Sequence, residues 1–189
     1  MKEQLRTRFT GHVVIRDAVT REVILDRYNA VHPQNMALAL ARSLAHDPDG
    51  YVFTMAFGNG GTFFNGSGQI VYRSPNTTGA ATLYNETYSV QVDESNVDTP
   101  PSNSVTASAS PDPSITSIVT ITAVLSPSEP PGEAAADNIT TDPEAPYMFD
   151  EIGLLTQDNL LLSHLIFSPI EKTANRAFLI SYTLTISVS

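Results

Sequence analysis

The chain has 189 residues, with 20 acidic and 10 basic ones, and a formal net charge of −10 at pH 7. This length suits one domain, and a hydrophobic content of 41% supports a buried core, which argues against a wholly disordered chain. No apolar run approaches the roughly 20 residues of a membrane-spanning helix. The absence of cysteine removes disulfides, thiol nucleophiles and cysteine-bound metals.

Charge is unevenly distributed along the chain. Residues 1–46 carry seven basic and four acidic groups, a net +3, whereas residues 47–189 carry three basic and sixteen acidic groups, a net −13. So acidic a chain repels phosphate backbones, which disfavours general nucleic-acid binding. The basic N-terminal part could dock on an acidic neighbour, including a second copy, or it could be ordinary solvated charge.

The first half of the chain predicts a hairpin followed by one helix. Apolar runs at 13–16 and 23–28 flank the polar segment 17–22, a pattern typical of two strands and their connection. Pro33 then suits a first helical position, and Met36, Leu40 and Leu44 recur at helical spacing. The pattern predicts a helix over about 33–46, ended by Asp-Pro-Asp-Gly at 47–50, with its apolar stripe in the core.

A glycine cluster follows the next predicted strand, at 51–57. The segment Phe57-Gly58-Asn59-Gly60-Gly61-Thr62 lacks the lysine and the following helix of a phosphate-binding loop. We therefore expect a tight turn in which glycine and asparagine adopt positive φ.

Strand patterns dominate the rest of the chain. They occur at 69–73, 82–92, 115–125, 147–156, 160–167 and 177–188, which brings the expected total to eight or nine. Two stretches, 93–113 and 126–146, hold nine of the thirteen prolines and are predicted to be long Pro/Ser/Thr-rich loops. The sequence thus predicts a single mainly β domain over 1–189, an antiparallel β-sandwich or jelly roll with one helix and two extended loops.

Catalytic and metal-binding patterns are not apparent. The four histidines lack metal-ligand spacing; His32 is expected to help the helix begin, and His164, in an apolar strand, to be a core residue. Adjacent Asp150 and Glu151 should point to opposite faces of a strand, which is poor geometry for paired acid–base work. Asp150, either buried or at an interface, is expected to cap a neighbouring turn. No enzyme activity, cofactor or metal is expected, although acids in the two loops could bind calcium weakly.

Several segments together resemble small virion structural proteins of tailed bacteriophages. These segments are GHVVIRD, NAVHPQNMALALARSLAHDP, AFGNGGT, LYNETYS, VTITAVLSPSEPPG, FDEIGLL and the final strand after PIEKTANR. The resemblance implies a glycine-rich turn after a strand, a late strand containing Glu-Ile-Gly-Leu, and a closing strand with alternating apolar residues. It carries over no catalytic residue.

The resemblance implies a non-enzymatic subunit of a phage particle, assembled in the host cytoplasm and located at the neck or collar, the tail or the baseplate. The expected partners are copies of itself and other virion proteins, without nucleic acid or membrane. A capsid decoration protein is one alternative, and a host-surface carbohydrate-binding module, with tyrosines that stack on sugars, is another. The candidate protein-interface residues are Arg6, Arg8, Tyr84, Asn85, Glu86, Tyr88 and Asp150.

Overall fold

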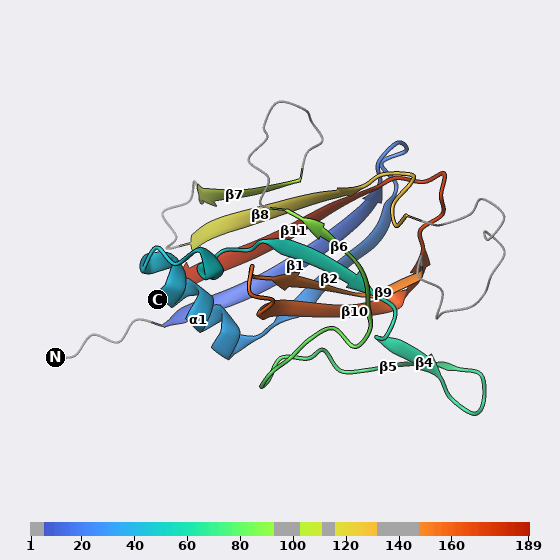
Figure 1. Ribbon diagram of the computed structural model, residues 1–189, viewed down its shortest axis with the longest axis horizontal. Coiled ribbons are helices and arrows are strands. Elements are labelled where there is room, and N and C mark those ends of the chain that lie inside the picture. The colour runs from blue at the N-terminus through green and yellow to red at the C-terminus, as the bar shows by residue number, and fades with distance from the viewer. Residues whose placement is uncertain (1–5, 93–102, 111–115, 132–147) are drawn as a thin grey trace.

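The computed structural model describes residues 6–92, 103–110, 116–131 and 148–189, which form a mainly β structure (Figure 1). Its helices are α1 (Pro33–Leu44) and the short 3-10 helix η1 (Pro48–Gly50). Its strands are β1 (Thr7–Asp17), β2 (Val23–Val31), β3 (Thr54–Gly58), β4 (Thr62–Phe64), β5 (Ile70–Tyr72), β6 (Glu86–Gln91), β7 (Ser104–Ala109), β8 (Thr116–Leu125), β9 (Met148–Leu155), β10 (Leu161–Glu171) and β11 (Phe178–Val188).

Nine of these strands form one curled antiparallel sheet in the order β6-β3-β9-β10-β2-β1-β11-β8-β7, and β4 pairs with β5 as a separate hairpin. Strand β2 joins the two halves of the sheet. It pairs with β1 from Gly11 to Arg16, but with β10 only at Ser163 and His164. Because the pairing at this junction is so short, the sheet can turn there and bring its halves face to face, as in a sandwich.

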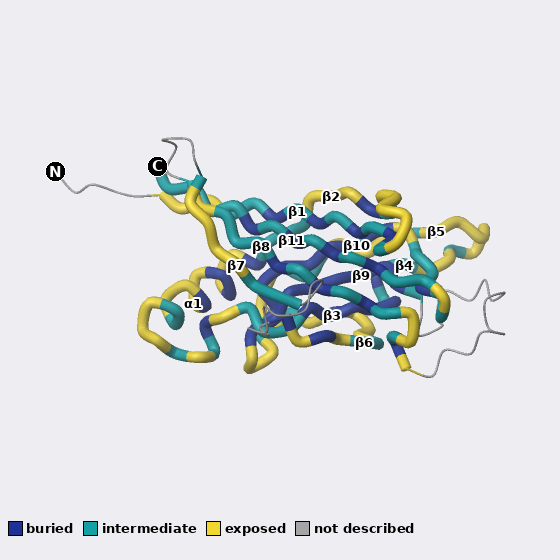
Figure 2. The backbone as a smooth tube through the Cα atoms, turned by 90° about the horizontal axis from the view of Figure 1, so that it is seen from above, coloured by how far each residue is buried: buried dark blue, intermediate teal, exposed yellow. Residues whose placement is uncertain are grey.

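The main core lies between the two halves. Its fully buried side chains come from β1, β8 and β11 on one side, including Val13 and Ile121, and from β3 and β9 on the other, including Met55 and Leu154. Figure 2 shows the strands of the two halves above one another, with buried residues in dark blue along both. The mainly β, sandwich-like class expected from the sequence is confirmed.

Helix α1 lies at one end of the sandwich. His32 caps it by accepting a hydrogen bond from the Asn35 N–H (3.2 Å), and Pro33 follows at the first helical position, as expected. The predicted apolar stripe is wrong in part: Met36 is buried, but Leu40 is 39% and Leu44 is 76% exposed. The helix docks through Asn35, whose side chain donates to the Leu161 carbonyl on β10.

The predicted strands and the hairpin connection at 17–22 are present, with boundaries shifted by a few residues. Two strands were missed. Strand β4 has only three residues, and β7 lies inside the stretch 93–113 that was predicted to be a loop. The rest of that predicted loop lies mostly outside the described residues, at 93–102 and 111–113, and so do residues 132–146 of the second loop. The acids considered as calcium ligands lie in these undescribed segments.

Residues 59–85, here called the arm, leave β3, form the β4–β5 hairpin and return to β6. Figure 1 shows the hairpin projecting at the end of the molecule opposite α1. The returning part covers the outer face of β9 and β10, where Leu83 packs with Ala56, Leu155 and Leu161 in a second small core. Strand β9 is therefore covered on both faces, and seven of its eight residues are buried.

Candidate functional site

The arm is anchored by two adjacent buried carboxylates on β9. Asp150 and Glu151 are 1% and 0% exposed. Asp150 accepts hydrogen bonds from the backbone N–H groups of Gly61 and Thr62, each at 2.7 Å, and from the Thr62 hydroxyl. The expectation that Asp150 caps a neighbouring turn is thus confirmed, and its carboxylate contacts this chain's own backbone.

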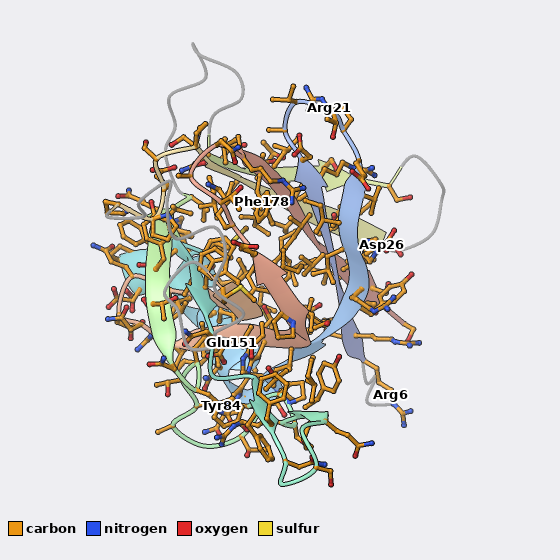
Figure 3. The ribbon with its side chains drawn as sticks, turned by 90° about the vertical axis from the view of Figure 1, so that its right-hand side faces the viewer. Arg6, Arg21, Asp26, Tyr84, Glu151 and Phe178 are labelled. Carbon is orange, nitrogen blue, oxygen red and sulfur yellow. The ribbon has the colours of Figure 1, made fainter. Side chains whose placement is uncertain are left out.

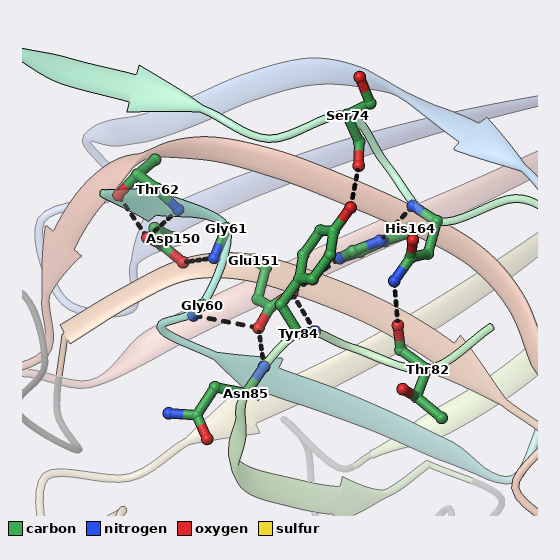
Figure 4. A network of polar contacts seen from close by, with 11 residues as sticks. Gly60, Gly61, Thr62, Ser74, Thr82, Tyr84, Asn85, Asp150, Glu151 and His164 are labelled. Carbon is green, nitrogen blue, oxygen red and sulfur yellow. Dashed lines mark hydrogen bonds and ion pairs between the residues drawn. The ribbon is translucent and has the colours of Figure 1, made fainter. Parts of the chain in front are cut away.

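Glu151 holds both ends of the arm. Its Oε1 accepts from the N–H groups of Gly60 (3.1 Å) and Asn85 (2.8 Å), and its Oε2 accepts from the N–H of Tyr84 (2.9 Å). Figure 4 shows these bonds converging on the carboxylate from two segments that are 24 residues apart in the chain. Buried carboxylates are stable only when such donors replace water, so the anchor and the arm depend on each other.

His164 completes the network from β10. Its Nδ1 accepts from the Asn76 N–H (2.9 Å), so its proton is on Nε2, which lies 3.0 Å from Glu151 Oε2 and donates to it. The ring is fully buried, and it is a hydrogen-bonded core residue as expected. Two oxygens of Glu151 therefore receive four donors, which matches the number that a carboxylate can accept.

The two carboxylates respond differently to burial. Burial would raise the pKa of Glu151, but the hydrogen bonds from His164, Asn85 and Tyr84 outweigh it and hold that pKa below its ordinary value of 4.5. For Asp150, burial prevails over the hydrogen bonds from Thr62 and Gly61, and with the nearby charge of Glu151 it raises the pKa above 3.8.

These directions predict a pH dependence of stability. The lowered pKa of Glu151 means that its stabilising contribution is complete above about pH 4.5 and is lost as the pH falls through the folded-state value. Asp150 acts in the opposite sense, because its raised pKa favours the folded state in acid. Urea unfolding from pH 6 to pH 3 should show that the Glu151→Gln variant loses less stability on acidification than the original chain. Parallel curves for the two proteins would contradict this.

The sequence-based geometry of this pair was wrong. Both carboxylates contact the arm, although adjacent residues of a regular strand point to opposite faces. The pairing with β10 shifts between Ile166 and Ile170, directly opposite Asp150, so alternation is broken at this point.

The glycine cluster was also explained wrongly. None of Gly58, Gly60 and Gly61 has a positive φ; among the described glycines, Gly68 and Gly79 do. The reason for glycine is close approach: a Cβ on Gly58 would lie 2.4 Å from the Asn85 carbonyl oxygen, and one on Gly60 would lie 2.6 Å from the Asn85 nitrogen. The absence of side chains lets the arm's two ends meet beside Glu151.

The other candidate interface residues lie in three places. Arg6 and Arg8 are exposed at the start of β1, and Glu86 is exposed at the start of β6. Tyr84 and Asn85 belong to the arm. Tyr88 is half-buried on β6, where burial and then the charge and hydrogen bond of Glu129 raise its pKa to about 12.

A hollow of about 660 Å³, here called the arm pocket, lies between the β4–β5 hairpin and the arm's return. It is lined by Asn59, Gly60, Thr62, Phe63, Phe64, Arg73, Tyr84 and Asn85. Sequence reasoning missed Arg73, although one signal was visible: it is the only charged residue between 59 and 85.

A second hollow of about 570 Å³, here called the α1 groove, lies at the opposite end, between α1, η1 and the sheet. Its lining is mainly apolar and includes Leu40 and Tyr51 with Val105 and Ala107 of the edge strand β7. The five tyrosines considered for sugar stacking are dispersed. Tyr51 is in this groove, Tyr84 is in the arm pocket, and Tyr72 lines a third pocket with Arg27 and Phe167. Tyr88 is half-buried on β6, and Tyr147 is outside the described residues.

Within the described part of the chain, His, Asp and Glu side chains form no group of three suited to a metal ion. No helix in the same residues has the length and apolar character needed to cross a bilayer. Comparisons with family models, with curated proteins and with solved structures gave no significant match to this chain.

Proposed function

We propose that the chain is a non-enzymatic structural subunit of a tailed-bacteriophage particle, located at the neck or collar, the tail or the baseplate. It assembles with copies of itself and with neighbouring particle proteins. The resemblance in sequence supports this, because three of its segments, AFGNGGT, LYNETYS and FDEIGLL, are the ones that Asp150 and Glu151 join at the arm.

The observation that carries the proposal is that, among the described residues, no strand pairs with the outer side of β7. Strand β7 is an edge of the sheet, and its sequence Ser-Val-Thr-Ala-Ser-Ala has neither a charge nor a proline. Soluble proteins normally protect edges with such residues, because an exposed edge pairs with other chains. The opposite edge, β6, does carry the exposed charge of Glu86.

The α1 groove adjoins this edge. Val105 and Ala107 alternate along β7 and line the groove beside the exposed Leu40 and Tyr51. A strand from a neighbouring subunit that paired with β7 would therefore place alternate side chains in the groove, the usual mode of strand addition. Assembly would cover apolar surface that the described residues leave open to solvent.

The buried carboxylates support a structural role. Each accepts several hydrogen bonds from the chain's own backbone and side chains, and the bonds to Asp150 and Glu151 fix the arm. A general acid or base needs a proton position that faces substrate. The network in Figure 4 uses these oxygens internally.

Self-association is tested by the change Leu40→Glu. We expect the purified protein to be an oligomer by light scattering coupled to size exclusion, and this variant to associate at least about tenfold more weakly, because a charge would enter an apolar interface. Leu38→Glu is the matched control: Leu38 is 42% exposed on the same helix and does not line the groove. A monomeric original chain, or equal effects of the two changes, would reject this assembly surface.

The place in the particle needs a separate measurement. Immunogold labelling of purified particles should decorate the neck, tail or baseplate. Label over the head shell would support the alternative capsid decoration protein, and unlabelled particles would remove the virion role.

A further inference from the structure

The arm pocket has the chemistry of a ligand site, and this inference does not depend on the proposed virion role. The β4–β5 hairpin, which lines the pocket, lies at the end of the molecule opposite α1 (Figures 1 and 2). It is open to solvent, and its wall combines three aromatic rings, one guanidinium and two side-chain amides. Its volume of about 660 Å³ lies within the range of small-molecule sites.

Arg73 is a cation that lies over two aromatic rings. Its guanidinium carbon lies 4.8 Å from the centroid of the Tyr84 ring and 5.6 Å from that of the Phe63 ring. Among the described residues it forms no ion pair, and it is the sole charged group of the arm. Stacking between rings leaves the planar edge of a guanidinium available for two parallel hydrogen bonds to a carboxylate.

The pocket wall is already rigid. The Arg73 N–H donates to the Gly61 carbonyl (2.8 Å), and Gly61 is itself held by Asp150. The Tyr84 hydroxyl donates to the Ser74 carbonyl (2.8 Å), while its N–H is bound to Glu151. Figure 3 shows Tyr84 at the surface below Glu151. A ligand would meet prearranged groups, which lowers the entropic cost of binding.

The remaining wall suits a sugar ring. Arg73 lies over the rings of Phe63 and Tyr84, whereas Phe64, which is 51% exposed, offers its ring to the C–H side of a pyranose. The Asn85 amide donates to the Asn59 carbonyl oxygen, which leaves the Asn85 oxygen as an acceptor for a hydroxyl. A polyanion is disfavoured, because one cation on a chain of net charge −10 cannot offset many phosphates.

We propose that the arm pocket binds a saccharide that carries a carboxylate, such as a hexuronic acid unit of a surface glycan. The carboxylate pairs with Arg73, the sugar ring packs on the Phe64 ring, and a hydroxyl donates to Asn85. The three interactions explain why a lone arginine, exposed aromatic rings and a free amide oxygen occur together at this end of the molecule.

The test is a titration of the full chain with sodium galacturonate and with galactose, its neutral counterpart, followed by amide and side-chain NMR shifts. Galacturonate should bind saturably and at least about tenfold more tightly than galactose, with shifts at Gly60, Gly61 and Asn85. Arg73→Gln should remove the preference for the acid, and Arg73→Lys should weaken it, since an ammonium binds as a point charge.

Arg21→Gln is the matched control. Arg21 lies in the β1–β2 connection at the other end of the view in Figure 3, so this change should leave binding unaltered. Equal binding of acid and neutral sugar, or binding unaffected by Arg73→Gln, would overturn the proposal. The proposal would also be overturned if the chain bound no sugar but self-associated, and if Arg73→Gln abolished this self-association. The carboxylate that pairs with Arg73 would then come from a second copy.

Discussion

The Glu151→Gln variant should lose about 3 kcal/mol of stability, which corresponds to a fall of about 10 °C in Tm for a chain of this size. Gln keeps the shape of the side chain but replaces one acceptor oxygen by an amide that donates. Four groups donate to Glu151: the N–H groups of Gly60, Tyr84 and Asn85, and the His164 ring. Two of these four donors would face the new amide at a side chain that is fully buried.

Thermal unfolding followed by circular dichroism measures this effect, and amide exchange locates it. Exchange should accelerate at Gly60, Tyr84 and Asn85 before it accelerates in the main core. The control is Glu86→Gln, the same change at an exposed residue next to the arm, which should stay within about 0.5 kcal/mol. A Glu151→Gln variant with unchanged Tm would show that the arm is held by other contacts.

A second large effect is expected for Gly58→Ala, at about 2–3 kcal/mol. The added Cβ would lie 2.4 Å from the Asn85 carbonyl oxygen and 2.5 Å from Glu151 Oε1. Backbone would have to move, because Gly58 also pairs with both Glu86 and Glu151 across the sheet. The change therefore disturbs the anchor and the β3–β6 pairing together.

Gly66→Ala is the matched control on the same arm. A Cβ at Gly66 has no atom within 4 Å, and its φ is not positive. This variant should be neutral or slightly more stable, because alanine reduces the freedom of the unfolded chain. Chemical denaturation of both variants decides the point: equal stabilities would mean that close approach is not the reason for glycine at 58.

Local sequence patterns predicted secondary structure well at helix starts marked by proline and in strands with regular alternation. Pro33 after His32 marked the beginning of α1, and strict alternation from Phe178 marked β11. Alternation also identified most strands of the sandwich, since each has one face in the core. By contrast, β4 has three residues and β7 has mostly exposed small side chains, so neither leaves a periodic signal.

The candidate site was only partly visible in the sequence. Tyr84 and Asn85 were identified, and they lie in the anchor and the arm pocket. Arg73 was not identified, and neither was the bonding of Tyr84 and Asn85 to Glu151, because a hydrogen bond between residues 66 positions apart has no local signature. The exposed Leu40 was mistaken for a core residue because helical spacing reports a shared face and does not report what covers it.

Composition and short-range periodicity are enough to predict the mainly β class, the long helix after His32, the absence of cysteine chemistry and the acidic charge. The tertiary structure alone decided that Asp150 and Glu151 both hold the arm, that glycine at 58–61 serves close approach, and that Arg73 stands between two rings. Each of these depends on contacts between segments that are distant in the chain, and such contacts arise from tertiary packing.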